Sequence, residues 1–380
     1  MREQFLSNCE KNFIKKIILE GHRLDGRNYD ESRKLDICFG SEYGSCIVSI
    51  GETKVLAQVS CEVVQPKQIR PNEGILYINV EISPMAAPQF EANRQTDLTV
   101  YLNRLLEKCY KDSKCIDLES LCIVVEEKVW SLRVDLKILN HEGNLIECSS
   151  IATLVSLAHF KRPDVTRSGE SVIIHTLAEN DPIPTVLYHY PVCLTFAIFQ
   201  NNVLISDPSY IEETVCTSTT EDGNTIGGLL VVGMNQYKEI CLLNHTEAAI
   251  HNSNIVHRAI QSAAERSKSV VDLIKAEIIR DDNLRQKRTK INFSDIITTN
   301  HVQSLSMKDL KICLKNYNIN DIKMEEDNSP TEILDDKQDI KPEKSKYDVV
   351  ASLPQTAEIK AKEGASTWIE ISSESDVDSS

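Results

Sequence analysis

Three cationic side chains stand at spacings that would let them act together. Arg104, Lys108 and Lys111 follow one another at i, i+4 and i+7 in a segment whose apolar residues recur at helical spacing. Residues at these spacings share one face of a helix, with about 6 Å between neighbours. Such a face could follow the phosphates of a nucleic-acid backbone, and Arg94 in the preceding loop could extend it. The alternative is an ordinary solvated face, paired with neighbouring acids.

A second group of side chains with chemical potential is acidic. Asp207 precedes a proline, and Glu212 and Glu213 follow it closely in the sequence. Carboxyl groups can act as general acids, but Asp-Pro also favours the start of a turn. We interpret Asp207 as a strand-end cap or turn residue in preference to a catalytic acid. The two glutamates are expected in a solvated loop or a partner contact.

The other candidate groups lack the spacing that their chemistry requires. The twelve cysteines form no CxxC pair and the nine histidines show no ligand spacing, so no metal and no other cofactor is predicted. His141 and Glu142 make half of a zinc-deaminase motif whose other half is missing. Gly223, Gly227 and Gly228 lead into a strand and not into a helix, which argues against a phosphate-binding loop.

The elements around these residues predict a dense α+β domain over residues 1–290. Strands are expected where apolar residues alternate or cluster between turns, and helices where they recur every three to four residues. The expected strands are 45–50, 54–63, 75–82, 132–138, 192–199, 203–206, 229–234 and 239–243, and the expected helices are 1–16, 93–111, 149–160 and about 246–285. Strands followed by a helix, twice over, predict two halves, about 1–165 and 166–290.

Composition limits the possible functions. The chain has 380 residues, 41% of them hydrophobic, and no apolar run long enough to span a membrane. A formal net charge of −15 argues against a protein that binds nucleic acid over its whole surface. A local basic face remains compatible with RNA, because phosphate contacts depend on the potential within about 8–10 Å. The N-terminus lacks the order of a signal peptide, so reduced thiols in the cytosol or nucleus are expected.

After residue 290 the chain becomes acidic and poor in apolar residues. Residues 291–380 hold 18 acidic and 10 basic side chains and are predicted to be mostly disordered, although 305–317 could form a short helix. The run 285–290 is a candidate nuclear-import signal or a solvated helix end. The candidate sites in the tail are SUMO-acceptor patterns at Lys323 and Lys341, a SUMO-interacting segment with Trp368, Ile369 and Ile371, and phosphorylation sites at Ser372, Ser373 and Ser375.

An ordered series of short motifs runs through roughly the first 285 residues. The motifs are GHRLDGR at 21–27, PMAAP at 84–88, NRQTD at 93–97, LNRLLE at 102–107, DSKCID at 112–117, VW at 129–130 and SSIA at 149–152. In this order they resemble the RNase PH-like ring subunits of the RNA exosome. The resemblance implies an RNase PH-like α+β fold followed by the acidic tail.

Compared with active RNase PH-like proteins, the sequence departs at both halves of the expected site. Those proteins cleave RNA with phosphate, using arginines to neutralise the anions and acids near the scissile bond. Asp207 matches the first expected aspartate, but Thr214 stands where the second is expected. The segment expected to carry the phosphate-site arginine reads IECSS at 146–150, and no arginine lies between Arg133 and Arg162. We therefore predict no catalytic residue and no phosphorolytic activity.

The resemblance also implies a role and a set of partners. The role is a structural and RNA-guiding subunit that supports 3′–5′ RNA processing and degradation, including rRNA maturation, with Arg104 and Lys108 as the best-matching RNA contacts. The partners are other RNase PH-like exosome ring subunits, RNA-binding cap subunits, associated nucleases and RNA, with no membrane. The expected location is the nucleus and nucleolus, and also the cytoplasm. Two alternatives stay open: an active phosphate-dependent 3′–5′ exoribonuclease, and an RNA-independent scaffold whose tail recruits factors.

Overall fold

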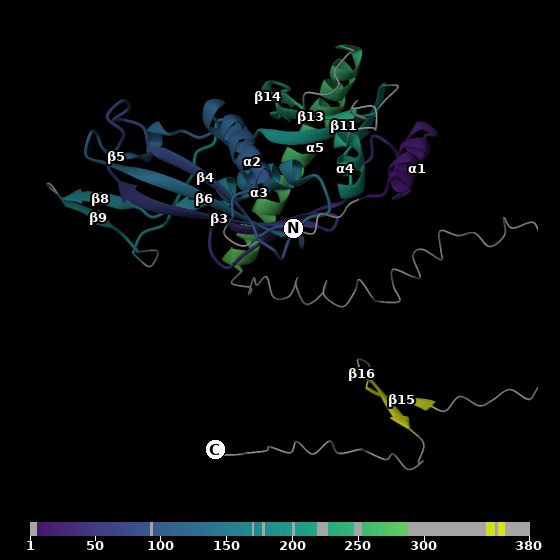
Figure 1. The fold of residues 1–380 in the computed structure, drawn as a ribbon. Helices are drawn as coiled ribbons and strands as arrows, with labels where there is room; N and C mark the ends of the chain where they lie inside the picture. The colour runs from purple at the N-terminus through teal and green to yellow at the C-terminus, as the bar shows by residue number, and fades with distance from the viewer. Residues whose placement is uncertain are drawn as a thin grey trace, which may run out of the picture. The chain divides into compact units, whose positions relative to one another are not determined.

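Two β-sheets, with helices between and around them, form the larger part of the structure (Figure 1). The structure, a computed structural model, describes residues 6–91, 94–168, 171–176, 179–199, 202–218, 227–246, 253–287, 347–353 and 356–361. By its internal contacts the chain divides into two units, Met1–Ile312 and Cys313–Ser380. Among the helices within these described ranges, none is long and apolar enough to cross a membrane.

The first sheet has six strands in the order β1-β2-β3-β6-β4, with β5 also paired to β6. The strands are β1 (Leu35–Phe39), β2 (Ser45–Ile50), β3 (Thr53–Val64), β4 (Ile75–Ile82), β5 (Cys122–Val124) and β6 (Lys128–Asn140). All neighbours are antiparallel except β4 and β6, which are parallel. Along β6 the alternating apolar residues are buried and Arg133 and Lys137 between them are exposed, so one face of the sheet carries the core.

The second sheet has four antiparallel strands in the order β12-β11-β13-β14. They are β11 (Val192–Phe199), β12 (Val203–Ser206), β13 (Gly227–Met234) and β14 (Ile240–His245). The central strand β11 is buried on both faces. Phe196 and Ile198 belong to the main core, whereas Ala197 and Phe199 belong to a smaller cluster on the other face. This double burial accounts for the continuous apolar sequence of β11.

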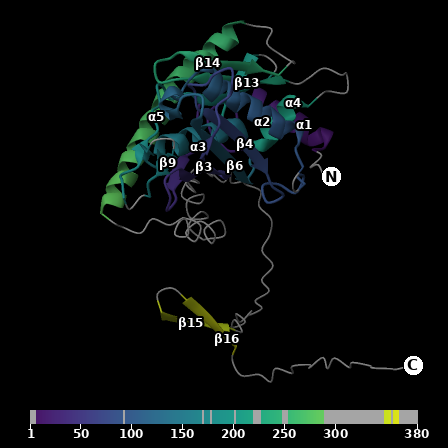
Figure 2. The same cartoon turned by 90° about the vertical axis from the view of Figure 1, so that its left-hand side faces the viewer.

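In the described residues, five helices and two short helical turns lie between and around the sheets. They are α1 (Asn8–Leu19), α2 (Asp97–Glu107), the π-helical turn η1 (Lys108–Asp112), the 3-10 turn η2 (Glu119–Leu121), α3 (Leu145–His159), α4 (Tyr210–Thr217) and α5 (Ser253–Gln286). Helix α3 is buried almost all round because it packs against β2, β3 and β6 of the first sheet and against β11 of the second. Helix α5 packs on β11, β13 and α3 and runs along one side of the domain (Figure 2). The main core therefore takes residues from both sheets.

Helices α1, α2, α3 and α5 begin at residues other than those predicted, and for the first three the structure shows how the N-terminus is formed. Helix α1 begins at Asn8 after a capping box formed by Ser7 and Glu10. Helix α2 begins at Asp97 because the Thr96 side chain accepts a hydrogen bond from the Thr99 amide and caps it. Helix α3 begins at Leu145, earlier than the predicted 149, after Asn144 in the left-handed conformation with φ 53°. The Thr96 cap sets the start of α2, whereas Asn144 makes no side-chain capping bond and α3 starts where the chain leaves the left-handed conformation.

Three small two-stranded sheets complete the described strands. They are β7 (Lys161–Arg162) with β10 (Ile183–Pro184), β8 (Val165–Ser168) with β9 (Ser171–Ile174), and β15 (Tyr347–Leu353) with β16 (Thr356–Ala361) in the second unit. The predicted helix at 305–317 and residues 288–290 of the basic run lie outside the described residues. So do all the candidate tail sites: Lys323, Lys341, Trp368, Ile369, Ile371, Ser372, Ser373 and Ser375. The mostly disordered tail stays a prediction.

Candidate functional site

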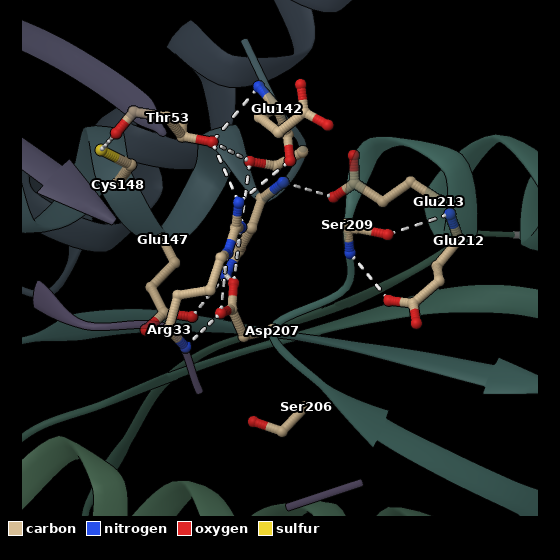
Figure 3. Close-up of polar contacts among 12 residues, drawn as sticks. Arg33, Thr53, Glu142, Glu147, Cys148, Ser206, Asp207, Ser209, Glu212 and Glu213 are labelled. Carbon is tan, nitrogen blue, oxygen red and sulfur yellow. Dashed lines mark hydrogen bonds and ion pairs between the residues drawn. The ribbon is translucent and has the colours of Figure 1, made fainter. Parts of the chain in front are cut away.

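Asp207 directly follows β12 in a left-handed conformation, with φ 49°, and is fully buried. Arg33 donates three hydrogen bonds to its carboxylate: from the backbone N to Oδ2 at 2.7 Å, from Nε to Oδ2 at 3.0 Å and from Nη2 to Oδ1 at 2.8 Å (Figure 3). Arg27 Nη1 donates to Oδ2 at 3.0 Å, and Asn144 Nδ2 donates to Oδ1 at 2.6 Å. Burial opposes ionisation, but the hydrogen bonds and charge of Arg33 lower the pKa of Asp207 to about 2. The carboxylate is therefore ionised and saturated with donors.

A second buried ion pair lies beside the first. Arg23 donates from Nη2 to Glu212 Oε2 at 2.6 Å and from Nε to Oε1 at 2.9 Å, and the two side chains are 0% and 1% exposed. Arg23 also donates to the backbone carbonyls of Ser206 and Asp207. Glu212 accepts from the Ser209 amide at 2.8 Å, which completes a capping box at the start of α4. The expectation of a solvated Glu212 is wrong, because this residue pairs with a buried arginine.

Asn144, the residue before α3, joins three carboxyl groups. Its Nδ2 donates to Asp207 and also to Glu147 Oε2 at 2.7 Å, while its backbone N donates to Glu213 Oε1 at 2.8 Å. Burial raises the pKa of Glu213 to about 7, against the effect of the Asn144 amide. Burial also raises the pKa of Glu147, opposed by Arg266, whose Nη2 lies 3.3 Å from Oε1. Glu213, expected in a solvated loop or a partner contact, lies against the start of α3.

The connection from β6 to α3 must pass very close to α4 for these contacts to form. Gly143 makes this possible, with φ 86°, because a Cβ there would lie 2.4 Å from the Tyr210 backbone N. Thr53 on β3 donates from Oγ1 to the Gly143 carbonyl at 2.8 Å, and Arg33 Nη1 donates to the Glu142 carbonyl at 3.0 Å. Two strands and two helices therefore fix the positions of Asp207, Glu147, Glu212 and Glu213, which we call the acidic cluster.

Thr214, at the position where a second acid is expected, has a structural role. Its hydroxyl donates to the Tyr210 carbonyl at 2.7 Å, one turn back in α4. Asp207 is saturated by its donors, so neither residue offers a free carboxyl group. Across the part of the chain that the structure describes, no cluster of three or more His, Cys, Asp or Glu side chains is placed to hold a metal ion. The cluster is an internally neutralised set of charges.

The predicted cationic face is present in part. Arg104 on α2 and Lys108 at the start of η1 are exposed, and neither forms an ion pair with any described residue. The Lys108 amide donates to the Arg104 carbonyl, so the two side chains keep the helical i, i+4 relation. Arg94 is exposed but paired, with its Nη1 2.9 Å from Glu91 Oε2. Of the four predicted contact residues, Arg104 and Lys108 are therefore the two that are both exposed and without an ion pair to a described residue.

Lys111 does not share the exposed face of Arg104 and Lys108. The π-helical turn η1 places more than the usual number of residues in one turn, which changes the direction of the side chains that follow Lys108. Lys111 is half-buried and lines a cavity of about 540 Å³ together with Lys67 and Lys114. The expectation that Lys111 continues the face of Arg104 and Lys108 did not allow for this turn.

The arginines of the acidic cluster were not among the predicted site residues. Arginine was expected next to α3, whereas the arginines that reach Asp207 come from the N-terminal segment, Arg33 being 174 residues away in the sequence. The available signal was the motif at 21–27, which contains Arg23 and Arg27. Cationic side chains are thus present at this site, supplied by another part of the chain.

Comparisons with known proteins show which family the chain resembles. Residues 31–163 match the model of the 3′ exoribonuclease family, domain 1. The chain is 44% identical over 317 residues to the exosome complex component RRP45 of Rattus norvegicus, covering 83% of this chain and 70% of the relative. It is 44% identical over 309 residues to the Homo sapiens protein of that name, covering 81% of this chain and 68% of the relative. The Schizosaccharomyces pombe protein is 35% identical over 281 residues, covering 74% and 92%.

A solved structure shows the same fold. A chain of the Archaeoglobus fulgidus exosome with RNA bound to the active site matches with a TM-score of 0.59 and 21% identity, covering 69% of this chain and 96% of that chain. The predicted RNase PH-like α+β fold is confirmed. The sequence motifs resemble the PM/Scl autoantigen subunit, also called exosome component nine, and human RRP45 carries that name.

Proposed function

Since the chain belongs to the RRP45 family of exosome complex components, we propose that it is a structural and RNA-guiding subunit of an exosome ring, without catalytic activity. In this role it supports 3′–5′ RNA processing and degradation, including rRNA maturation. Its partners are other RNase PH-like ring subunits, RNA-binding cap subunits and the nucleases that act on the RNA. We place it in the nucleus and nucleolus, and also in the cytoplasm.

The state of Asp207 is the observation that carries the absence of catalysis. A general acid must hold a proton that it can give to the leaving oxygen. Asp207 is ionised and accepts five hydrogen bonds from Arg27, Arg33 and Asn144, so it holds no proton and has little capacity for a further ligand. Thr214 has no acidic group at all. These two positions favour a silent subunit over an active phosphate-dependent exoribonuclease.

The purified full chain should release no nucleoside diphosphate from single-stranded RNA in the presence of inorganic phosphate. The assay separates the products by chromatography, with an active RNase PH-like enzyme as positive control. Diphosphate release that disappears in the Asp207→Asn variant would assign phosphorolysis to this site and overturn the proposal. Release that persists in the variant would point to a contaminating nuclease, and the chain itself would remain silent.

The chain is expected to be insoluble or self-associated when produced alone. Several large apolar side chains are exposed on the first unit, including Phe13, Ile69, Met85 and Tyr237. Ring subunits cover such surfaces with their neighbours. Co-expression with another RNase PH-like exosome subunit should give a soluble heterodimer in size-exclusion chromatography. A stable monomer that does not bind such partners would contradict ring membership. Co-expression with an unrelated soluble protein, which should not form a heterodimer, serves as the negative control.

The RNA-guiding part of the proposal rests on Arg104 and Lys108. Two exposed cations one helical turn apart, without ion pairs to described residues, suit contacts with successive phosphates. An RNA-independent scaffold whose tail recruits factors would leave these cations without a role. The two possibilities differ in whether RNA affinity depends on Arg104 and Lys108.

A further inference from the structure

A cavity of about 540 Å³ lies where the start of β4 meets the segment that follows η1. Its lining includes Lys67, Lys111, Lys114 and Tyr188, and we call it the lysine pocket. Its volume is within the range of about 300–1,000 Å³ that is typical of ligand sites. None of the three lysines forms an ion pair with a described residue. The lysine pocket therefore offers amino groups that no described carboxylate neutralises by direct contact.

The backbone at the end of η1 is irregular where it places two of these lysines. Lys111 belongs to the π-helical turn, and Lys114, just beyond it, adopts a left-handed conformation with φ 54°. π-helical turns are frequent at functional sites, and the left-handed residue after a helix end is usually glycine, because glycine has no Cβ. A lysine at this position is unfavourable for the backbone, so a role in binding explains it better than a role in folding.

The acidic side chains of the lining are less available than the lysines. The lining holds four cationic and four acidic side chains. Glu73 accepts from Arg70 Nη1 at 3.0 Å, and Asp117 Oδ1 accepts from two backbone amides of its own turn, at 3.1 and 3.3 Å. Three of the four cations and two of the four acids thus have no such partner among the described residues. A ligand that enters the lysine pocket meets an excess of unpaired positive charge.

Tyr188 adds an exposed aromatic ring to the pocket. Its side chain is 60% exposed, yet its hydroxyl donates to the Asp117 carboxylate and its backbone amide donates to the Cys115 carbonyl at 2.8 Å. An anchored ring beside unpaired cations is how proteins bind single-stranded nucleic acids, because a base stacks on the ring while the cations contact the phosphates. An acidic peptide would use the lysines but would not need the ring. The combination therefore favours RNA.

We infer that the lysine pocket binds one nucleotide of a single-stranded RNA, with the three lysines on its phosphates and the Tyr188 ring against its base. This rests on the proposed RNA-guiding role and extends it. Lys108 and Lys111 belong to the same π-helical turn, so one RNA strand can contact both the exposed face of Arg104 and Lys108 and the lysine pocket. Lys111 is then an RNA contact, at a different site from the one that its helical spacing predicts.

RNA affinity of assembled rings across a salt series, with an oligouridine as the probe, tests the inference. Lys111→Gln/Lys114→Gly removes two cations, and glycine suits the left-handed conformation, so these rings should melt no lower than wild-type rings. The log–log salt slope should flatten by roughly 0.7 for each lost phosphate contact. Lys16→Gln/Lys268→Gln removes two exposed cations elsewhere, as the matched control, and should change neither affinity nor slope.

Two substitutions of Tyr188 test the contact with the base. Tyr188→Ala should lower the RNA affinity roughly five- to hundredfold and leave the salt slope unchanged, because it removes a stacking surface and no charge. Tyr188→Phe keeps the ring and should bind like the wild-type ring. Equal losses in the two variants would overturn the stacked base, since the hydroxyl and not the ring would then be what matters.

The outcome for the lysines separates this inference from the proposed function. Unchanged affinity and slope in intact Lys111→Gln/Lys114→Gly rings would overturn the lysine pocket, while RNA guidance would stand if Arg104→Glu/Lys108→Glu rings still bind RNA weakly. Unchanged binding in both sets of rings would contradict RNA guidance as well. Lysine variants that fail to assemble, or that keep RNA and lose a protein partner, also overturn the inference, because a protein then occupies the pocket.

Discussion

Replacing Arg23 with methionine is expected to lower the free energy of unfolding by about 3–5 kcal/mol. Methionine has a similar volume but leaves Glu212 charged in a site where its side chain is 1% exposed. It also removes the donors to the carbonyls of Ser206 and Asp207, which then lack these partners inside the protein. For a chain of this size the melting temperature should fall by roughly 10 °C. Urea and thermal unfolding measure the loss, with all variants held in one assembly state.

Two further variants show whether the unpaired charge is the cause. Arg23→Met/Glu212→Gln removes the charge but keeps the capping box of α4, since glutamine also serves at that position, and should recover part of the loss. Arg94→Met breaks the surface pair with Glu91, whose side chains are 58% and 52% exposed, and should cost less than about 1 kcal/mol. Equal effects of Arg23→Met and Arg94→Met would show that the buried pair contributes no more than an exposed one.

Much of the strand framework could be predicted from the sequence because the apolar patterns there are strong and bounded by turns. The strands at 45–50, 75–82, 192–199 and 203–206 have the predicted bounds. Helix α3 is different, because it is buried on nearly all sides and so lacks a polar face that would mark its period. The π-helical turn η1 was not predictable either, since its sequence continues the helical pattern of α2.

The sequence pointed to acidic residues of this cluster but not to the arginines that pair with them. Asp207, Glu212 and Glu213 lie within seven residues of one another, but the local pattern predicts a strand-end cap or turn for Asp207 and a solvated loop or partner contact for the two glutamates, because charged residues are usually exposed. Their burial depends on Arg23 and Arg33, which are brought to the end of β12 by the packing of the N-terminal segment. No local pattern encodes a pairing across more than a hundred residues. The resemblance carried by the 21–27 motif indicated the fold and not the contacts of its arginines.

Changing both Arg104 and Lys108 to glutamate in an assembled ring should weaken RNA binding strongly at low salt. Each cation that contacts a phosphate releases counterions when RNA binds, so its loss should lower the log–log salt slope by roughly 0.7 for a single strand. For two contacts the slope should flatten by about one to two units. The effect should be independent of RNA sequence, because phosphates carry no base information. RNA affinity across a salt series, measured for wild-type and variant rings, gives both quantities.

A matched variant separates local contact from net charge. Lys16 on α1 and Lys268 on α5 are exposed and have no ion pair with described residues, so Lys16→Glu/Lys268→Glu makes the same change in charge elsewhere. It should leave the slope nearly unchanged if Arg104 and Lys108 contact the RNA directly. Equal losses in the two variants would mean that RNA responds only to the overall field of an acidic chain. Native mass spectrometry must show intact rings in every sample, so that a loss of affinity reflects RNA contacts and not a loss of assembly. Folding should be unaffected, because neither Arg104 nor Lys108 belongs to the buried core. An unchanged affinity and slope in an intact Arg104→Glu/Lys108→Glu ring would leave the scaffold role as the better account of this subunit.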